Sequence, residues 1–345
     1  MYEDLKIRIK EISKSKKIKV FYFGNTAGIE KNSFYLTALR KNYKFEYFGA
    51  IIFSENSAKK ISKIVDGKFD FILLDVEKKV ISKKINQYGF KNYVNIERAV
   101  KETVKKTKIY NYKGNDLTIN ACETLVNHIY SQDPRGVGGK KILVLGVGNI
   151  GFKISLKLLE AGADVYLYRR NKNILSNISK TINFIKPKAT VAKAKIIKNL
   201  NINLKNFDLI IGATKQKSLI FSKHVKKLNS KVKIIDIGKG IIDKNALDLL
   251  LEKSIQVYRL DVTPGYDGHL ENIYSTLKIN DTKLKKLRKL KNFKLVKRGI
   301  LSKENSIIVD DVNNPKIVYG ISDGRGGFKK VSSKKISQIK KNLKK

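Results

Sequence analysis

A glycine-rich turn between an apolar run and a helix-like run constrains the fold of this 345-residue chain more than any other feature. The apolar run Lys141–Leu145 leads into Gly-Val-Gly-Asn-Ile-Gly at positions 146–151, and a helix-like pattern continues to Glu160. A second apolar run, Asp164–Tyr168, follows at once. A G-x-G-x-x-G turn within such a strand–turn–helix–strand unit indicates a dinucleotide-binding site. The first glycine permits a tight turn, the second lets the backbone approach a diphosphate, and the third lets helix and strand pack closely.

The end of the second strand indicates which dinucleotide is bound. NAD sites of this type carry an acidic residue about 20 residues after the first glycine, where it binds the ribose 2′-hydroxyl. Here the strand ends in Arg169 and Arg170, and the nearest acid, Asp164, precedes the strand. A guanidinium suits a 2′-phosphate because its donors form a fork. We therefore expect NADP(H) rather than NAD(H); the alternative is a solvated arginine pair in a basic protein.

The composition is that of a folded protein with more than one domain. Apolar residues make up 42% of the chain, and its length exceeds what one core usually serves. No apolar run reaches the ~18 residues of a membrane helix, and the N-terminus lacks a signal-peptide pattern. The single cysteine, Cys122, and three widely separated histidines show no ligand spacing, so we expect no metal. We expect a cytoplasmic protein.

The formal net charge of +43 is the most unusual bulk property. Such a charge favours nucleic acid or an anionic membrane as a partner. The lysines, however, are spread along nearly every segment, and Lys, Ile and Asn share AT-rich codons, which points to compositional drift. The sequence has no helix-turn-helix, zinc-finger or aromatic RNA-binding pattern. We therefore do not expect nucleic-acid binding, and we interpret the densest basic run, residues 328–345, as a solvated terminal helix.

Strand-like and helix-like segments alternate on both sides of the glycine turn. Before it, we expect strands at 17–23, 45–53 and 69–74 and helices at 34–39, 57–65, 96–104 and 117–130. After it, we expect strands at 206–214, 233–237 and 256–261 and a helix at 245–252. This alternation predicts an α/β protein with mostly parallel sheets.

The chain is expected to form two domains and an extension. An N-terminal α/β substrate domain covers residues 1–130, and a doubly wound, NAD(P)-binding Rossmann domain covers residues 131–275. A Gly/Pro-containing linker at 131–139 separates them. Residues 276–345 form a basic extension that we expect to pack back on the domains. Within it, residues 305–319 resemble a hairpin.

Ligands of open parallel sheets lie beyond the carboxyl ends of the strands. That rule places the glycine turn, the two arginines and the ends of the later strands, including Lys239 and Asp261, around one crevice. Free amides at the start of the helix suit a diphosphate there. The residues expected to bind the cofactor are Gly146, Gly148, Asn149, Ile150, Gly151, Arg169, Arg170, Ala213, Thr214 and Gly238.

Residues from about 115 to 261 resemble the shikimate dehydrogenase superfamily, which includes methylenetetrahydrofolate dehydrogenases and glutamyl-tRNA reductases. The resemblance is carried by Gly114-Asn-Asp116 before a helix, by the glycine turn, by Arg169 and by Asp208-Leu-Ile-Ile-Gly-Ala-Thr214. It implies an amino-acid-dehydrogenase-like N-terminal domain, an NADP-binding domain and oxidoreductase activity. The family's Ser-x-Ser substrate clamp should lie between residues 24 and 33, where only Ser33 is present, so we do not expect shikimate itself as the substrate.

The resemblance also implies a catalytic Asp paired with a Lys. Asp116 matches the Asp, and Lys79 follows a strand at the place of the Lys, with Lys78 as a rival. Such a pair relays a proton when the lysine is desolvated. The alternative for Asp116 is capping of the helix that follows. A further candidate is His269, as a general acid in a segment, residues 261–272, that we expect to be a loop; the alternative is a polar turn.

Three functions are consistent with the sequence. The favoured one is an NADP(H)-dependent oxidoreductase, acting on a small polar metabolite at a cleft between the two domains. The second is an NAD(P)-binding sensor or assembly protein without redox activity, and the third is a polyanion-binding protein driven by the lysines. We expect a small-molecule substrate as the partner, and a homodimer is left open.

Overall fold

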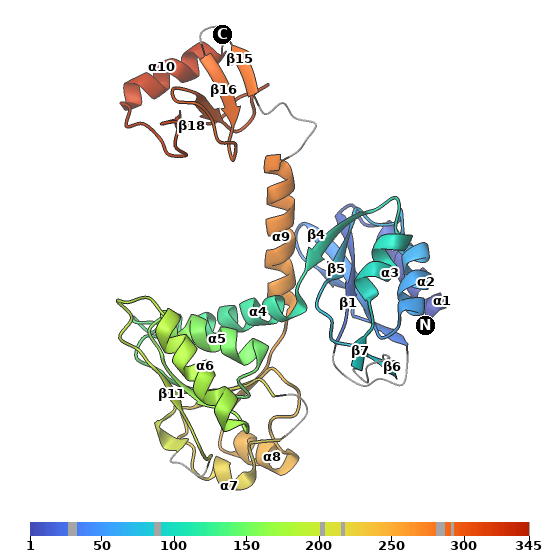
Figure 1. The fold of residues 1–345 in the computed structure, drawn as a ribbon, viewed down its shortest axis with the longest axis vertical. Helices are drawn as coiled ribbons and strands as arrows, with labels where there is room; N and C mark the ends of the chain where they lie inside the picture. Colours follow the sequence, from blue (N-terminus) through green and yellow to red (C-terminus); the bar gives the residue numbers. More distant parts are fainter. Residues whose placement is uncertain are drawn as a thin grey trace. The chain divides into compact units, whose positions relative to one another are not determined.

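A computed structural model of the protein describes residues 1–26, 33–85, 91–200, 204–214, 218–280, 287–290 and 293–344. The chain forms two compact units, Met1–His269 and Leu270–Lys345 (Figure 1). The first unit contains two large sheets and the second unit one small sheet. None of the helices in the described part of the chain has the length and apolarity that a membrane crossing requires.

The first sheet is mostly parallel. Its order is β2 (Phe34–Leu36), β4 (Phe45–Ile52), β1 (Ile18–Gly24), β5 (Phe71–Asp75) and β8 (Lys108–Tyr112), with β3 (Arg40–Lys41) paired to β4. Strands β2 and β3 run antiparallel to β4, and the other pairs are parallel. A two-stranded sheet, β6 (Ile81–Ile85) and β7 (Lys91–Tyr93), follows β5 in the chain.

Three helices bury their apolar faces against one side of this sheet: α1 (Tyr2–Ser13), α2 (Glu55–Val65) and α3 (Ile96–Thr103) (Figure 1). Helix α2 shows why such a helix forms. Ser54 caps it by accepting a hydrogen bond of 3.2 Å from the amide of Ser57. Ala58, Ile61 and Val65 follow at helical spacing and are buried against the sheet.

The second sheet contains the glycine turn and is fully parallel. Its order is β11 (Ala194–Ile196), β10 (Asp164–Tyr168), β9 (Lys141–Leu145), β12 (Leu209–Gly212), β13 (Lys233–Asp236) and β14 (Gln256–Arg259). In chain order this is 3-2-1-4-5-6, the doubly wound dinucleotide-binding arrangement. Helix α4 (Gly114–Ile129) leads from β8 to β9, and the crossover helices are α5 (Asn149–Glu160), α6 (Lys172–Ile185), α7 (Ser222–Val225) and α8 (Lys244–Glu252).

Side chains of β9 alternate between two separate cores, which is why helices cover both faces. Ile142 and Val144 belong to the core with α4, α5 and α6. Leu143 and Leu145 belong to the core with α7 and α8. The expected α/β fold with a doubly wound, parallel Rossmann sheet is confirmed.

The second unit contains a small β-sheet and a terminal helix. Strands β15 (Leu287–Leu290), β16 (Phe293–Lys297), β17 (Ile307–Val309) and β18 (Val318–Ile321) pair in that order, and α10 (Ser333–Lys344) contributes Ile339 to the core. Strands β17 and β18 are antiparallel, so the expected hairpin is confirmed. The expected terminal helix corresponds to α10.

Two local predictions are wrong. The helix expected at 34–39 is instead β2, because Phe34 pairs with Ile52 across the sheet and this long-range pairing overrides the local spacing. The loop expected at 261–272 is largely helical, since α9 (Thr263–Asn280) begins there. Pro264 lies in the first turn of α9, where a proline is tolerated, and the side chain of Asp261 accepts a hydrogen bond of 2.9 Å from the amide of Thr263.

Candidate functional site

The glycine turn places the start of α5 at the carboxyl end of the second sheet. Gly146 has φ +96°, a left-handed conformation that favours glycine, and its amide donates to the carbonyl of Tyr168 over 2.9 Å. A Cβ at Gly151 would lie 2.4 Å from the carbonyl oxygen of Gly146, so this glycine lets helix and strand meet. A Cβ at Gly148 would meet nothing within 4 Å. Open space therefore lies in front of the helix N-terminus, where free amides and the helix dipole favour an anion.

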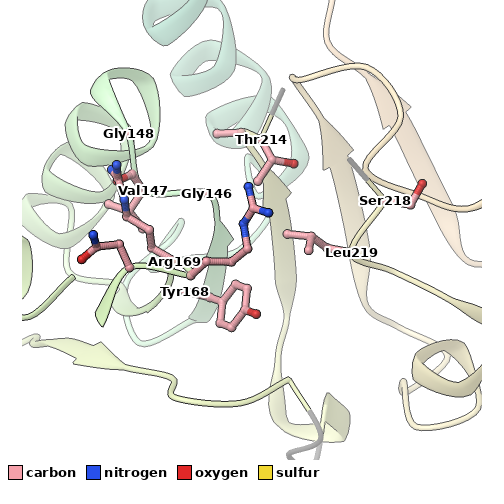
Figure 2. A pocket seen from close by; sticks show the side chains of 11 residues that line it. Gly146, Val147, Gly148, Tyr168, Arg169, Thr214, Ser218 and Leu219 are labelled. Atoms are coloured by element: carbon pink, nitrogen blue, oxygen red, sulfur yellow. The ribbon is translucent and has the colours of Figure 1, made fainter. Parts of the chain in front are cut away.

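A cavity of about 500 Å³ opens on one side of this turn. Figure 2 shows the turn residues and Arg169 on one side of it and Ser218 and Leu219 on the other. Arg169 is half-buried and its Nη1 donates to the carbonyl of Val147 over 2.6 Å, whereas Arg170 is exposed. The cavity is lined by Gly146, Val147, Gly148, Tyr168, Arg169, Arg170, Asn171, Ala213, Thr214, Ser218 and Leu219.

A second cavity, of about 520 Å³, also reaches the N-terminus of α5. Ile150 lines it from the start of α5, Asp75 and Lys79 from the end of β5 and beyond, and Lys239 and Arg259 from the ends of β13 and β14. Both large sheets of the first unit thus contribute side chains to this cavity. Its remaining lining residues are Gly24, Asn25, Thr26, Arg40, Ile51, Tyr112, Gly114, Asn115, Leu117, Thr118, Ile237, Leu260, Asp261, Val262 and Tyr266.

Lys79 forms ion pairs with two carboxylates on this cavity wall. Its Nζ lies 3.1 Å from Oδ2 of Asp75 and 2.7 Å from Oε2 of Glu77. The Asp75 carboxyl is almost fully buried, at 2% side-chain exposure, and burial raises its pKa, an effect that the charge of Lys79 partly offsets. Lys78 is exposed and is not among the lining residues, so the geometry favours Lys79 over its rival.

The expected pair of Lys79 and Asp116 does not form. Asp116 lies in the first turn of α4 and its Oδ1 is 2.5 Å from Nζ of Lys153 on α5. It is not the N-cap either, because α4 begins at Gly114 with Lys113 as the N-cap. The two residues before Asp116 do contact the carboxylates that bind Lys79. The amide of Asn115 donates to Glu77 over 2.8 Å, and that of Gly114 donates to Asp75 over 3.4 Å.

His269 lies on α9 and is not among the residues that line the second cavity. Its ring packs on Tyr112 with 6.3 Å between centroids, and its Nε2 is buried without a hydrogen-bond partner among the described residues. Burial lowers the pKa of His269 despite a hydrogen bond to the backbone of Asn111. The geometry therefore does not bring His269 together with Lys79.

The remaining predicted cofactor residues lie at three places. Ala213 and Thr214 line the first cavity beyond the end of β12. Gly238 follows β13 and lines neither cavity; a Cβ there would lie 1.7 Å from the carbonyl oxygen of Thr214, so this glycine lets the two strand ends approach. The side chain of Asn149 is 3.4 Å from that of Asn115.

Sequence reasoning missed Asp75, Glu77 and Arg40 as site residues. A signal was present for Asp75, because a charged residue at the end of an apolar run faces the carboxyl edge of a parallel sheet. Ser33 is exposed, and residues 27–32 of the expected clamp segment lie outside the described residues.

The segment that contains the second sheet is similar to a known protein family. Residues 125–293 match the family model described as D-isomer specific 2-hydroxyacid dehydrogenase, NAD binding domain. The matched segment contains the glycine turn, the strands of the doubly wound sheet and the residues that line the first cavity. The segment is a Rossmann domain of the NAD-binding type. The match covers just under half of the chain.

Three further proteins are similar to this chain. Phenylalanine dehydrogenase of Lysinibacillus sphaericus is 23% identical over 137 residues, which is 40% of this chain and 34% of that protein's length. One of the subunits of dipicolinate synthase from Bacillus halodurans has a TM-score of 0.38 at 14% identity, over 72% of this chain and 91% of that one. L-tryptophan dehydrogenase of Nostoc punctiforme has a TM-score of 0.41 at 12% identity, over 72% and 71%.

These findings agree with the enzyme class expected from the sequence. The Rossmann segment matches the NAD-binding domain of a dehydrogenase family, which agrees with the expected NAD(P)-dependent dehydrogenase or reductase. The nicotinamide cofactor is supported in the same way. The family model describes 2-hydroxyacid dehydrogenases and the matching curated relative is an amino-acid dehydrogenase, so the resemblance to shikimate dehydrogenases specifically is not shown.

Proposed function

We propose that the protein is an NADP(H)-dependent dehydrogenase or reductase that acts on a small polar metabolite in the second cavity. One observation carries the proposal: two cavities of about 500 and 520 Å³ are both lined by residues of the glycine turn at the start of α5. Arg169 and Arg170 line one of them, and the ion pair of Lys79 and Asp75 lines the other. A dinucleotide whose diphosphate rests on the Rossmann turn needs such a cavity at each end.

The residues of the first cavity fit a phosphorylated adenosine. The open space at Gly148 leaves room for the diphosphate beside the amides of Asn149 and Ile150. Arg169 is well suited to a 2′-phosphate because it is half-buried, next to the turn, and forms no ion pair with a carboxylate among the described residues. This argument favours NADP(H) over NAD(H).

The residues of the second cavity fit a proton relay. When bound, the nicotinamide donates or accepts a hydride. The substrate carbon exchanges this hydride, and the oxygen or nitrogen bonded to that carbon gains or loses a proton; Lys79 is the cavity residue we assign to the proton transfer. Asp75 and Glu77 orient the Lys79 ammonium, since it lies within 3.1 Å of both carboxylates. Asp116 stays outside this assignment because it pairs with Lys153.

The proposal is tested by fluorescence titration with NADPH and NADH, followed by a panel of small oxo and hydroxy acids, imines and amino acids. We expect NADPH to bind more tightly than NADH and at least one substrate to be turned over. Tight NADPH binding without turnover across the panel would favour a sensor instead. Absence of binding by either nucleotide would refute the proposal, and a steep loss of polyanion affinity with salt would favour the polyanion-binding alternative.

A further inference from the structure

Arg40 lines the second cavity from the N-terminal sheet, on β3. Its Nε donates to the hydroxyl of Thr263 over 2.9 Å, and its Nη1 donates to the hydroxyl of Tyr22 over 3.0 Å. Tyr22 in turn donates to Thr37 over 2.7 Å and packs on the ring of Tyr266, 4.7 Å away. Tyr22 and Tyr266 are 2% and 8% exposed, so the guanidinium is held on a rigid, buried support.

The hydrogen bonds of Arg40 leave most of its donors unused. A guanidinium carries five N–H groups, and only two bonds, both to neutral hydroxyls, are formed among the described residues. The nearest carboxylate in this network belongs to Asp261, and it reaches Arg40 through the hydroxyl of Thr263, which donates to Asp261 over 2.7 Å. Asp261 also acts on Arg40 electrostatically but forms no ion pair with it among the described residues.

A half-buried cation without a paired anion is costly unless something else satisfies it. Structural arginines in such places normally form fork-like pairs with Asp or Glu, and this one faces a cavity of about 520 Å³ instead. Lys239 and Arg259 line the same cavity, whereas the charge of Lys79 is already matched by Asp75 and Glu77. Lys239 also has a left-handed backbone, φ +63°, a strained conformation typical of functional sites.

We infer that Arg40 binds an oxyanion of the substrate, a carboxylate or a phosphate, and so orients the substrate within the second cavity. The assignment rests on the proposed function for the identity of the ligand as a substrate, but the anion site itself stands on the geometry of Arg40. Tyr22 and Thr263 act as positioning residues, because they fix the plane of the guanidinium.

The experiment is calorimetric titration of the full-length protein with oxalate and, separately, with inorganic phosphate, at constant ionic strength, with and without saturating NADPH. We expect one of the two anions to bind to the wild type, and which one binds distinguishes the carboxylate from the phosphate. Arg40→Gln should weaken that binding roughly tenfold or more, and Arg40→Lys should lose part of the affinity because the fork is lost.

Lys41→Gln is the matched control. Lys41 is the neighbouring residue on β3, is exposed, and does not line the cavity, so its loss removes the same charge without touching the site. We expect less than a twofold change from it. Equal weakening by Arg40→Gln and Lys41→Gln would overturn the inference, as would no binding of either anion to the wild type. Failure of NADPH to bind would refute the proposed function but not the anion site, since the anion site is judged on the titration done without NADPH.

Discussion

Lys79 and Asp75 form a largely buried ion pair, with 3.1 Å between Nζ and Oδ2, on the wall of the second cavity. The backbone of α4 closes over this pair. An added Cβ at Gly114 would lie 2.9 Å from Oδ2 of Asp75 and 3.0 Å from Nζ of Lys79. The glycine at the start of α4 therefore leaves room for the pair, which connects the Gly114-Asn-Asp116 segment to the site through Gly114 rather than through Asp116.

Gly114→Ala is expected to displace the ion pair and lower kcat by roughly 10- to 100-fold, because small misplacements of catalytic groups cost that much. The Kd for NADPH should not change, since the first cavity is untouched. The measurements are steady-state rates with a substrate found in the panel and fluorescence titration. Gly268→Ala is the control: a Cβ there meets nothing within 4 Å. Full activity of Gly114→Ala would argue against a role of the pair in the reaction.

The glycines at 148 and 151 should separate cofactor binding from folding. Gly148 has φ −100° and open space around it, so Gly148→Ala should fold with an unchanged Tm and bind NADPH roughly tenfold less tightly, because the methyl group enters the diphosphate site. Gly151→Ala should instead lower stability by about 1–3 kcal/mol, because its Cβ would lie 2.4 Å from the Gly146 carbonyl. Thermal melts and NADPH titration check both. The same phenotype for both variants would contradict this division.

Arg169 should determine the choice between the two nicotinamide cofactors. Arg169→Glu removes the guanidinium and adds a carboxylate, which repels a 2′-phosphate and accepts hydrogen bonds from a ribose 2′-hydroxyl. We expect the affinity for NADPH to fall by roughly 10- to 150-fold, the range for a lost charged hydrogen bond, and the preference to shift towards NADH. Arg98→Gln, at an exposed arginine paired with Glu55, is the control. An unchanged ratio of the two dissociation constants would refute the NADP(H) assignment.

The pH dependence of stability should reflect two histidines. Burial lowers the pKa of both His224 and His269 in the folded protein, with the nearby lysines 223 and 227 adding to the effect at His224. Unfolded histidines protonate near pH ~6.5, so below that pH the unfolded chain binds more protons and stability falls with acidification.

Urea unfolding between pH 7 and pH 5 checks this, since most carboxylates stay ionised in that window. The wild type should lose stability, and the double variant His224→Asn/His269→Gln should lose less. The ring of His224 accepts a hydrogen bond of 3.1 Å from the amide of Phe221, which an asparagine side chain can partly replace. Parallel pH profiles for the two proteins would show that other groups control acid sensitivity.

Much of the α/β architecture is readable from the sequence because its signals are local. The strand at Asp164–Tyr168 lies where the apolar run predicts it, and the Gly146–Gly151 turn carries its meaning in six consecutive residues. The helix at 34–39 was misjudged for the opposite reason, because Phe34 is held in a strand by pairing with Ile52 across the sheet. The loop at 261–272 was misjudged although its signal is local, because Pro264 marks the start of a helix rather than a loop.

The Rossmann unit, the place of the glycine turn and the arginines beside it are readable from the sequence alone, because each depends on neighbouring residues and on a fixed periodicity. Which carboxylate pairs with Lys79 depends instead on how the chain packs in three dimensions. Asp75 lies at the end of a buried strand and pairs with it, whereas Asp116 turns towards Lys153. The placement of Arg40 against Tyr22 and Thr263 was decided in the same way, because it joins residues 223 positions apart. Ion pairs and ligand cavities depend on such long-range packing, which no local pattern encodes.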